Sequence, residues 1–168
     1  CLNIHNTQPS HGLTSEQMSA FVERVIQHPL NWSVHTMSLL LRSRLEASRT
    51  RTVERSTLQL QALIDQMPTN DSSVRERLRF FHALELPAKW AMQSELAHRY
   101  VSIGVLRSAL ETFERVEMWE NVVQCLGLLG RQQEGIEVVR DLLEGRKTEA
   151  EAQLQAKRIA TSVSRVPH

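Results

Sequence analysis

The feature that most constrains the fold of this sequence is a pair of short apolar stretches, each of which ends in a glycine. The stretch ELAHRYVSIG ends at Gly104 and the stretch MWENVVQCLGLLG ends at Gly130, so the glycines are 26 residues apart, from position 104 to position 130. A second amphipathic stretch follows each glycine, over residues 105–116 and 136–143. Apolar residues recur at helical spacing in all of these stretches, which predicts two consecutive helical hairpins.

The length of these helices constrains how the hairpins pack. A hairpin whose helices have only about three turns each cannot bury its own apolar faces, because both faces need a neighbour. We therefore expect the hairpins to stack side by side. We expect Gly130 to permit a tight turn with a close approach of the two helices, and Trp119 to fill space against the preceding hairpin.

The remainder of the chain also has a helical pattern. No segment shows the two-residue alternation or the enrichment in Val, Ile and Thr that strands require. Capping residues mark three helix starts, at Thr14, Asn31 and Ser73, and a further helix is predicted around residues 53–67. The fold class is therefore all-α, and the stacked arrangement predicts a right-handed α-solenoid of antiparallel helical hairpins.

The composition argues against several classes of protein. The 168 residues include 20 basic and 19 acidic side chains, so no general attraction to nucleic acid or to an anionic membrane is expected. The two cysteines, Cys1 and Cys125, form no CxxC or Cys/His pattern, which argues against a disulfide framework and a zinc site. No apolar run is long enough to span a membrane. We therefore expect no membrane partner and a cytoplasmic location, with the nucleus as a second compartment.

The first of the two hairpins follows the tetratricopeptide pattern. Its matching positions are Leu96, Ala97, Tyr100, Gly104, Ala109 and Phe113. The second hairpin matches at Trp119 and Gly130 but departs from the pattern at Val123, Leu126, Gly135 and Val139. The spacing is also shorter than the usual repeat of about 34 residues. The pair therefore resembles a degenerate tetratricopeptide array, and we expect the matching residues to have structural roles.

Longer strings in the sequence resemble one particular family. The strings TVER and LQLQAL, with MWE further along, resemble the middle part of the tetratricopeptide-repeat protein 27 family, in a fungal member, over roughly residues 13–145. In that family the region precedes a longer repeat array. The family is associated with chaperone-assisted assembly of large complexes, notably a spliceosomal ribonucleoprotein, and in fungi with cell-wall maintenance. The resemblance implies a non-catalytic scaffold without a cofactor, whose partners are assembly clients or components of a chaperone complex.

The repeat pattern and the helix punctuation together divide the chain into four parts. We expect an irregular lead-in over 1–12, non-repeat helical hairpins over 13–86, two degenerate tetratricopeptide-like hairpins over 87–145, and a charged helical tail over 146–168. The thin apolar stripe of the tail consists of Leu154, Ile159 and Val163. Because the chain begins with Cys rather than Met, we interpret it as a segment of a longer protein.

The best candidate for a binding surface is an arginine-rich stretch over residues 42–79, which holds eight arginines and five acidic residues. Guanidinium groups suit both acidic peptides and phosphates, so an acidic-peptide or nucleic-acid binder is the alternative to the scaffold. The interleaved acids and the lack of an aromatic platform favour solvated or locally paired arginines, so direct contact with nucleic acid is not expected. The candidate residues are Arg42, Arg44, Arg49, Arg51 and Arg55, with Arg75, Arg77 and Arg79 nearby in sequence.

A second candidate surface is the inner face of the repeat hairpins. The residues at the corresponding positions are Ser94, His98, Glu120 and Gln124. A clamp for a terminal carboxylate needs Lys and Asn at such positions, so no clamp of this kind is expected. His98 can contact a ligand from the groove, but its apolar neighbours favour a hydrogen-bonded packing role.

Patterns for catalysis and metal binding are missing from the sequence. The seven histidines form no HxxxH or HExxH pair, and no glycine-rich phosphate loop occurs. Cys125 lies in an apolar helix, where a packing residue is far more frequent than a thiolate. We therefore expect no enzyme activity, no cofactor and no metal. A helical enzyme whose site forms only on folding stays a further alternative.

Overall fold

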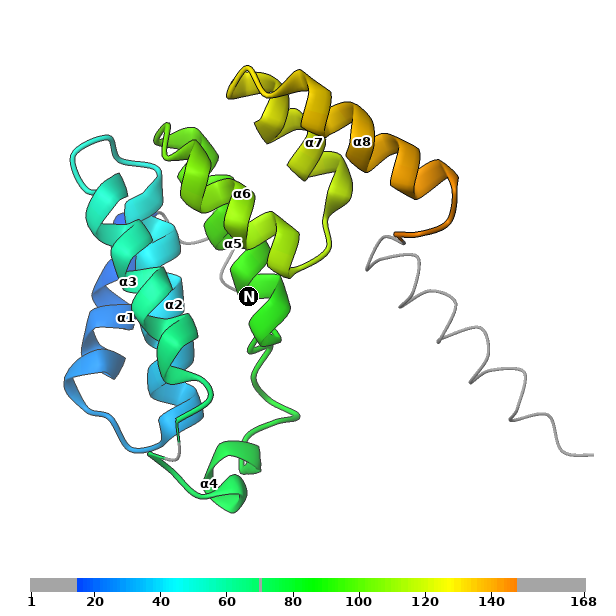
Figure 1. The fold of residues 1–168 in the computed structure, drawn as a ribbon. Helices are drawn as coiled ribbons and strands as arrows, with labels where there is room; N and C mark the ends of the chain where they lie inside the picture. The colour runs from blue at the N-terminus through cyan, green and yellow to red at the C-terminus, as the bar shows by residue number, and fades with distance from the viewer. Residues whose placement is uncertain (1–14, 70, 148–168) are drawn as a thin grey trace, which may run out of the picture. The chain divides into compact units, whose positions relative to one another are not determined.

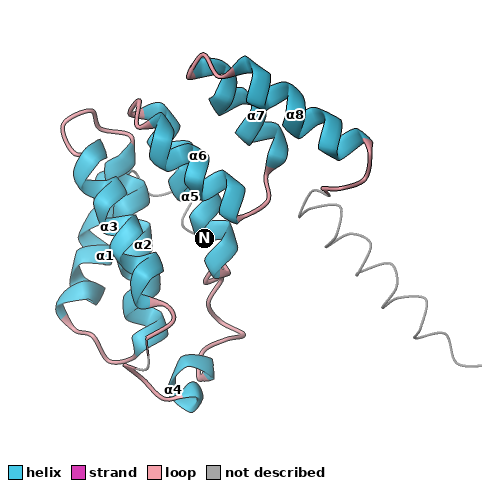
Figure 2. Ribbon diagram, viewed as in Figure 1, coloured by secondary structure: helices cyan, strands magenta, loops and turns pink. Residues whose placement is uncertain are grey.

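The computed structural model of the chain describes residues 15–69 and 71–147, and all of its regular elements there are α-helices (Figures 1 and 2). No strand occurs within these residues, so the all-α prediction is confirmed. The predicted cap at Thr14, the lead-in and the apolar stripe of the tail lie outside the described residues. The helices are α1 (Ser15–Gln27), α2 (Trp32–Ala47), α3 (Val53–Gln66), α4 (Val74–Leu78), α5 (Lys89–Ser102), α6 (Leu106–Arg115), α7 (Trp119–Leu128) and α8 (Gln132–Leu143).

The described helices belong to two compact units of the chain. The division falls between Met92 and Gln93, within α5 and a few residues after the predicted start of the repeat hairpins at residue 87. Helices α1 to α4 belong to the first unit, and α6 to α8 belong to the second. Each unit has its own buried apolar cluster.

In the first unit, α2 packs against both α1 and α3. Met18 and Val22 lie one turn apart on α1 and bury their side chains with Leu45 of α2. Leu60 and Ile64 have the same spacing on α3 and are also buried. Residues four apart lie on one face of a helix, so this spacing directs an apolar face of each helix into the core.

Small hydroxyl residues occupy much of the interior of α2 and α3. The buried ones are Ser33, Thr36, Ser38, Ser43, Ser56 and Thr57. The Ser43 hydroxyl donates to the carbonyl oxygen of Ser56 at 2.9 Å, which joins the two helices. The Thr57 hydroxyl donates to the carbonyl oxygen of Val53 at 2.8 Å. A buried hydroxyl without such an acceptor would be costly, so these bonds are what allow small polar residues to line the interface.

The short helix α4 is held on the N-terminal end of α2 by polar contacts. Asn31 caps α2, as predicted, because its Oδ1 accepts from the backbone N–H of Ser33 at 3.0 Å. The Ser73 hydroxyl accepts from the backbone N–H of Glu76 at 3.2 Å and so caps α4. The Glu76 side chain turns to the other helix, where its Oε1 accepts from the backbone N–H of Trp32 at 3.1 Å. One acidic residue thus ties the starts of two helices together.

The second unit has an apolar core formed by α5, α6 and α7. Its buried members are Ala97, Ala109, Leu110, Phe113, Val122, Cys125 and Leu126. Leu96 is buried as well, and Tyr100 packs against the cluster from its edge. Trp119 also packs against this core but is only partly buried, and the ammonium of Lys147 lies 4.6 Å from its ring centroid.

Four consecutive helices end in the same left-handed turn. The residue with positive φ is Gly104 (80°), Glu117 (59°), Gly130 (74°) and Gly145 (70°), respectively. After α5, for example, the backbone N–H of Val105 donates to the carbonyl oxygen of Tyr100 at 2.8 Å, which is the long bond of a Schellman motif. The helix α6 ends in this way without a glycine, so Glu117 holds a conformation that disfavours residues with a Cβ.

The structure gives a different reason for Gly130 than the sequence predicted. A Cβ built on Gly130 would meet nothing within 4 Å, so the predicted close approach of two helices at this glycine is wrong. The glycine is favoured because its φ of 74° is left-handed. A Cβ built on Gly135 of α8 would meet the neighbouring helix α7, but at an ordinary contact distance of 3.8 Å from Cγ1 of Val123.

Candidate functional site

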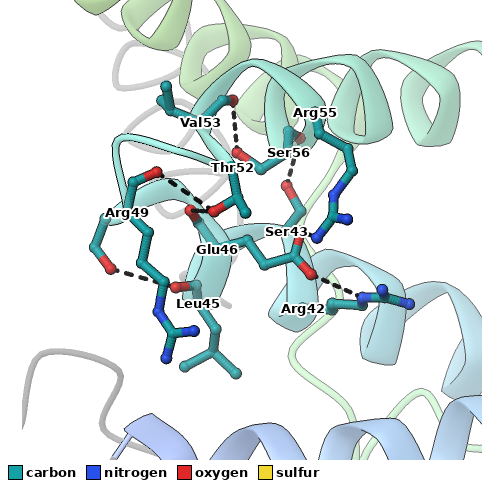
Figure 3. Close-up of polar contacts among 10 residues, drawn as sticks. Arg42, Ser43, Leu45, Glu46, Arg49, Thr52, Val53, Arg55 and Ser56 are labelled. Atoms are coloured by element: carbon teal, nitrogen blue, oxygen red, sulfur yellow. Dashed lines mark hydrogen bonds and ion pairs between the residues drawn. The ribbon is translucent and has the colours of Figure 1, made fainter.

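The loop between α2 and α3 forms a corner that is held by Glu46 (Figure 3). Arg42 Nε lies 3.0 Å from Glu46 Oε1, and Arg55 Nη2 lies 2.9 Å from Glu46 Oε2. The Thr52 hydroxyl donates to the carbonyl oxygen of Glu46 at 2.8 Å. One carboxylate therefore draws together arginines from both helices and fixes the chain between them.

The environment of Glu46 favours its charged form. Its side chain is 17% exposed, and burial alone would raise the pKa of the carboxyl group. The hydrogen bonds and charges of Arg42 and Arg55 outweigh burial and hold the pKa of Glu46 below its usual range. Two of the predicted binding arginines are thus paired within the molecule.

The other three predicted arginines lie near the same corner. Arg49 and Arg51 are on the connecting loop with exposed side chains, and Arg44 is half-buried on α2. Arg49 and Arg51 are therefore the exposed cations of this corner that Glu46 does not bind. A pair of exposed guanidinium groups can accept a carboxylate or a phosphate of a ligand.

The structure does not bring the whole arginine-rich stretch into one surface. The corner lies at the C-terminal end of α2, whereas α4, with Arg75 and Arg79 on it or next to it, contacts the N-terminal end of α2. A helix of 16 residues is about 24 Å long, so the two groups lie at opposite ends of the first unit (Figure 1). Arg77 has a structural role, because its Nη1 donates to the carbonyl oxygen of Met67 at 2.8 Å and its guanidinium lies 4.1 Å from the ring centroid of Trp32.

The predicted inner-face residues lie on two helices, with Ser94 and His98 on α5 and Glu120 and Gln124 on α7. His98 Nδ1 lies 2.8 Å from the carbonyl oxygen of Ser94, and its Nε2 lies 3.5 Å from Nδ2 of Asn121 on α7. Because a carbonyl oxygen can only accept, Nδ1 carries the proton and Nε2 accepts from the amide of Asn121.

The position of His98 is set by three helices of the second unit. Its ring packs edge-on against Phe113 of α6, with the ring centroids 5.0 Å apart. The imidazole is therefore oriented by packing and by hydrogen bonds at both nitrogens. The sequence did not indicate Asn121, because it lies on a neighbouring helix and no local pattern connects it with His98.

An open apolar hollow lies between α7 and α8. Its volume is about 260 Å³, and it is lined by Val123, Gly127, Gln132, Gly135, Ile136 and Val139. Ile136 is 51% exposed and Val139 is 41% exposed. The helical spacing predicted an apolar stripe on α8, but it did not reveal that this stripe is open. A hollow of this kind suits the apolar face of a partner helix.

The described residues form no metal centre and no activated thiol. No group of three or more His, Cys, Asp or Glu side chains among them is placed to hold a metal ion. Cys125 is buried, and burial raises the pKa of its thiol, which disfavours a nucleophilic thiolate. None of the helices in the described ranges has the length and apolar character needed to cross a membrane.

Comparison with known proteins identifies several relatives of this chain. No protein-family model and no solved structure matches it. It is 42% identical over 175 aligned positions to TPR repeat-containing protein C19B12.01 of Schizosaccharomyces pombe, which covers 86% of this chain and 21% of that protein. It is 40% identical over 144 positions to the tetratricopeptide repeat protein 27 homolog of Dictyostelium discoideum, and this match covers 86% of this chain and 17% of that protein. A Saccharomyces cerevisiae protein named "Essential for maintenance of the cell wall protein 1" is 28% identical over 162 positions. This match covers 89% of this chain and 18% of that protein.

These similarities and the helical fold define a helical-repeat protein of the tetratricopeptide class. Within that class, most of this chain is similar to a protein named as a tetratricopeptide repeat protein 27 homolog, so the predicted resemblance to that family is confirmed. The chain spans about a fifth of the length of the curated relatives it matches, with 21% and 17% of the first two.

Proposed function

We propose that this chain is a non-catalytic helical-repeat scaffold that binds protein partners. Its relatives are named as repeat proteins, and repeats of this class work by presenting a surface to other chains. The observation that carries the proposal is the open apolar hollow between α7 and α8, because an exposed apolar surface marks a site of interaction. An amphipathic helix of the partner lies along this hollow with its apolar side inward.

We place this scaffold in a factor for chaperone-assisted assembly of large complexes. The resemblance to the tetratricopeptide-repeat protein 27 family supports biogenesis of a spliceosomal ribonucleoprotein, with assembly clients or chaperone components as partners. The relative from Saccharomyces cerevisiae, which is named for maintenance of the cell wall, supports a cell-wall role in fungi. We place this function in the cytoplasm, with the nucleus as a second compartment.

The second unit offers a partner a surface that is already formed. The left-handed turns fix the ends of its helices, and the buried core around Phe113 fixes their packing. A surface that does not need ordering on binding loses less free energy when the partner docks. We retain the inner-face residues as further polar contacts of a partner, in addition to the apolar hollow, namely Ser94, His98, Glu120 and Gln124.

The proposed binding site is tested by capturing partners with the full-length protein. The double variant Ile136→Asp/Val139→Asp places two charges in the hollow and should lose protein complexes that the unchanged protein retains, because a charge buried without a partner is costly. Leu143→Asp is the control, since Leu143 is 84% exposed and does not line the hollow. Capture of the same complexes by all three proteins would show that partners bind elsewhere.

A second candidate function is binding of RNA or of an acidic peptide at the α2–α3 corner. Exposure of Arg49 and Arg51, away from the ion pairs of Glu46, favours it. Phosphate binding by several arginines weakens steeply as salt rises, whereas an apolar hollow responds little to salt. A nanomolar affinity for RNA that falls steeply with salt and is lost in Arg49→Glu/Arg51→Glu would replace the first proposal. No observation on the described residues favours the helical enzyme.

A further inference from the structure

The short helix α4 and the turn after it carry an exposed apolar stripe. Val74, Leu78 and Phe81 are spaced four and three residues apart, which places them on one side of a helical path. The path continues beyond α4, because the backbone N–H of Phe81 donates to the carbonyl oxygen of Leu78 at 3.1 Å. The three side chains are 72%, 56% and 65% exposed, in chain order. Single exposed apolar residues are ordinary, but three on one stripe indicate a contact surface.

The orientation of α4 is the reverse of the usual one for a surface helix. Two of its polar residues face the rest of the first unit: Glu76 Oε1 accepts from the backbone N–H of Trp32 at the start of α2, and Arg77 Nη1 donates to the carbonyl oxygen of Met67 at 2.8 Å. The Ser33 hydroxyl adds a bond to the carbonyl oxygen of Arg77 at 2.6 Å. A helix of five residues does not persist by itself, so these contacts hold it in place and direct its apolar side outward.

Exposed arginines flank the stripe. Between residues 71 and 85 the sequence holds three arginines and three acidic residues, but Glu76 is bonded to α2, Asp71 accepts from the Thr69 hydroxyl at 2.6 Å, and Glu85 lies beyond the end of the stripe. Arg75 and Arg79 are exposed, and the guanidinium of Arg79 lies 5.3 Å from the ring centroid of Phe80. His82 is exposed as well and packs edge-on against Phe81, with centroids 5.4 Å apart. A partner that covers the stripe therefore needs acidic groups beside its apolar ones.

We propose that the stripe of Val74, Leu78 and Phe81, with Arg75 and Arg79 beside it, docks an acidic amphipathic helix of a partner protein. The three apolar side chains bind the apolar face of that helix, and the two arginines bind carboxylates on its borders. This surface is separate from the α7–α8 hollow, so the proposal does not depend on the function proposed for the hollow. Two exposed cations are fewer than the four to eight basic residues of a typical segment that binds anionic membranes, which favours a protein partner.

The experiment uses this chain and two synthetic amphipathic peptides, both labelled for fluorescence anisotropy. One peptide places Glu beside its Leu stripe, and the other places Lys at the same positions. We expect micromolar binding of the Glu peptide, no measurable binding of the Lys peptide, and a loss of about tenfold or more in affinity in Phe81→Asp, as for an aromatic anchor of an interface. Arg75→Glu/Arg79→Glu should weaken binding of the Glu peptide and gain binding of the Lys peptide.

Controls separate this stripe from the other exposed apolar surface and from loss of folding. Leu143→Asp adds the same charge on α8 and should bind the Glu peptide unchanged. Circular dichroism of Phe81→Asp should match that of the unchanged chain, because Phe81 is 65% exposed. Failure of the Glu peptide to bind, or equal binding of both peptides, would overturn the proposal.

The same variants test other occupants of the stripe. Binding of phosphatidylserine vesicles or of oligouridine that is lost in Phe81→Asp would assign the stripe to a membrane or to RNA and overturn the proposal. Concentration-dependent dimerisation in sedimentation experiments, lost in the same variant, would assign it to a second copy of this chain and overturn it as well. A monomer that binds the Glu peptide and neither of the other probes is the result expected.

Discussion

The α1–α4 unit and the α5–α8 region are both built from short helices, but different interactions join the helices in each. Between α2 and α3, buried hydroxyls bond to backbone carbonyls, as Ser43 does to Ser56. Between α5, α6 and α7, apolar side chains interlock around Phe113, and left-handed turns end the helices. Only the second arrangement is visible in the sequence as a repeat pattern, because hydrogen bonds of small residues have no apolar periodicity.

The largest expected effect is a loss of stability when the apolar core around Phe113 is changed. Phe113→Ala should destabilise the chain by about 3–5 kcal/mol, because Phe113 is 1% exposed and its removal leaves a cavity in the core. Chemical denaturation followed by circular dichroism measures the change. Phe81→Ala is the matched control, since Phe81 is 65% exposed and its loss should change stability little. Similar losses in the two variants would contradict the placement of the core.

The next effect tests the hydrogen-bonded interface of the first unit. Ser43→Val should cost about 1–3 kcal/mol, because it removes a buried hydroxyl and forces a larger side chain between α2 and α3. Ser43→Ala removes the hydroxyl alone and should cost less. The same denaturation measurement compares the two, and a Val variant as stable as the unchanged chain would show that the interface has room that the structure does not indicate.

A smaller effect is expected at the left-handed turns that end the helices of the second unit. Glu117→Gly should stabilise the chain by about 1 kcal/mol, because Glu117 has a φ of 59° that glycine adopts without strain. Gly130→Ala is the reciprocal variant and should destabilise by a similar amount, since it introduces the same strain at a φ of 74°. Thermal unfolding of both variants is the measurement. Opposite signs are expected. A destabilising Glu117→Gly would show that the Glu117 side chain makes a contact that stabilises the fold by more than the backbone strain costs.

Another small gain is expected inside α8. Gly135→Ala should stabilise the chain by about 0.5–1 kcal/mol, because alanine costs less backbone entropy than glycine in a helix. Space is sufficient, since the new Cβ would lie 3.8 Å from Val123 and 3.9 Å from Leu126, which are ordinary contact distances. Thermal unfolding checks this as well. A loss of stability would mean that α7 and α8 pack more closely than described.

The smallest effect concerns the pH dependence of the α2–α3 corner. Because folding lowers the pKa of Glu46, its contribution to stability is present above the pKa of an unfolded Glu and is lost as pH falls through the folded pKa. Glu46→Gln should therefore be less stable than the unchanged chain at neutral pH, and the difference should disappear in acid. Denaturation at several pH values measures it, with the exposed Glu54→Gln as the control. A difference that persists in acid would assign the effect to packing rather than to charge.

Local patterns in the sequence predicted the class of fold and part of the second unit. The helical spacing of Ala97, Ala109 and Phe113 indicates a buried face, and these residues are buried. The turn residues Gly104 and Gly130 were visible because glycine is the usual residue at positive φ. Glu117 performs the same task with no such signal, so only the apolar spacing over residues 105–116 indicated where α6 ends.

The binding surfaces were harder to predict, because they depend on contacts between residues distant in sequence. Arg42 and Arg55 become an ion-pair network only when folding brings both to Glu46. Arg77 looks like its neighbours in the sequence but bonds to Met67 and stacks on Trp32. Which arginines remain available is therefore a property of the fold, and the sequence alone could indicate only the group from which they come.

The even placement of the left-handed turns restricts how the length of this chain can vary. Positions 104, 117 and 130 succeed one another at steps of 13 residues, so α6 and α7 fill equal intervals. One inserted or deleted residue within either helix would rotate the downstream side chains of that helix by about 100° and turn a buried stripe toward water. Natural insertions and deletions should consequently gather elsewhere, for instance in the connection over residues 48–52, and stay rare between residues 104 and 130.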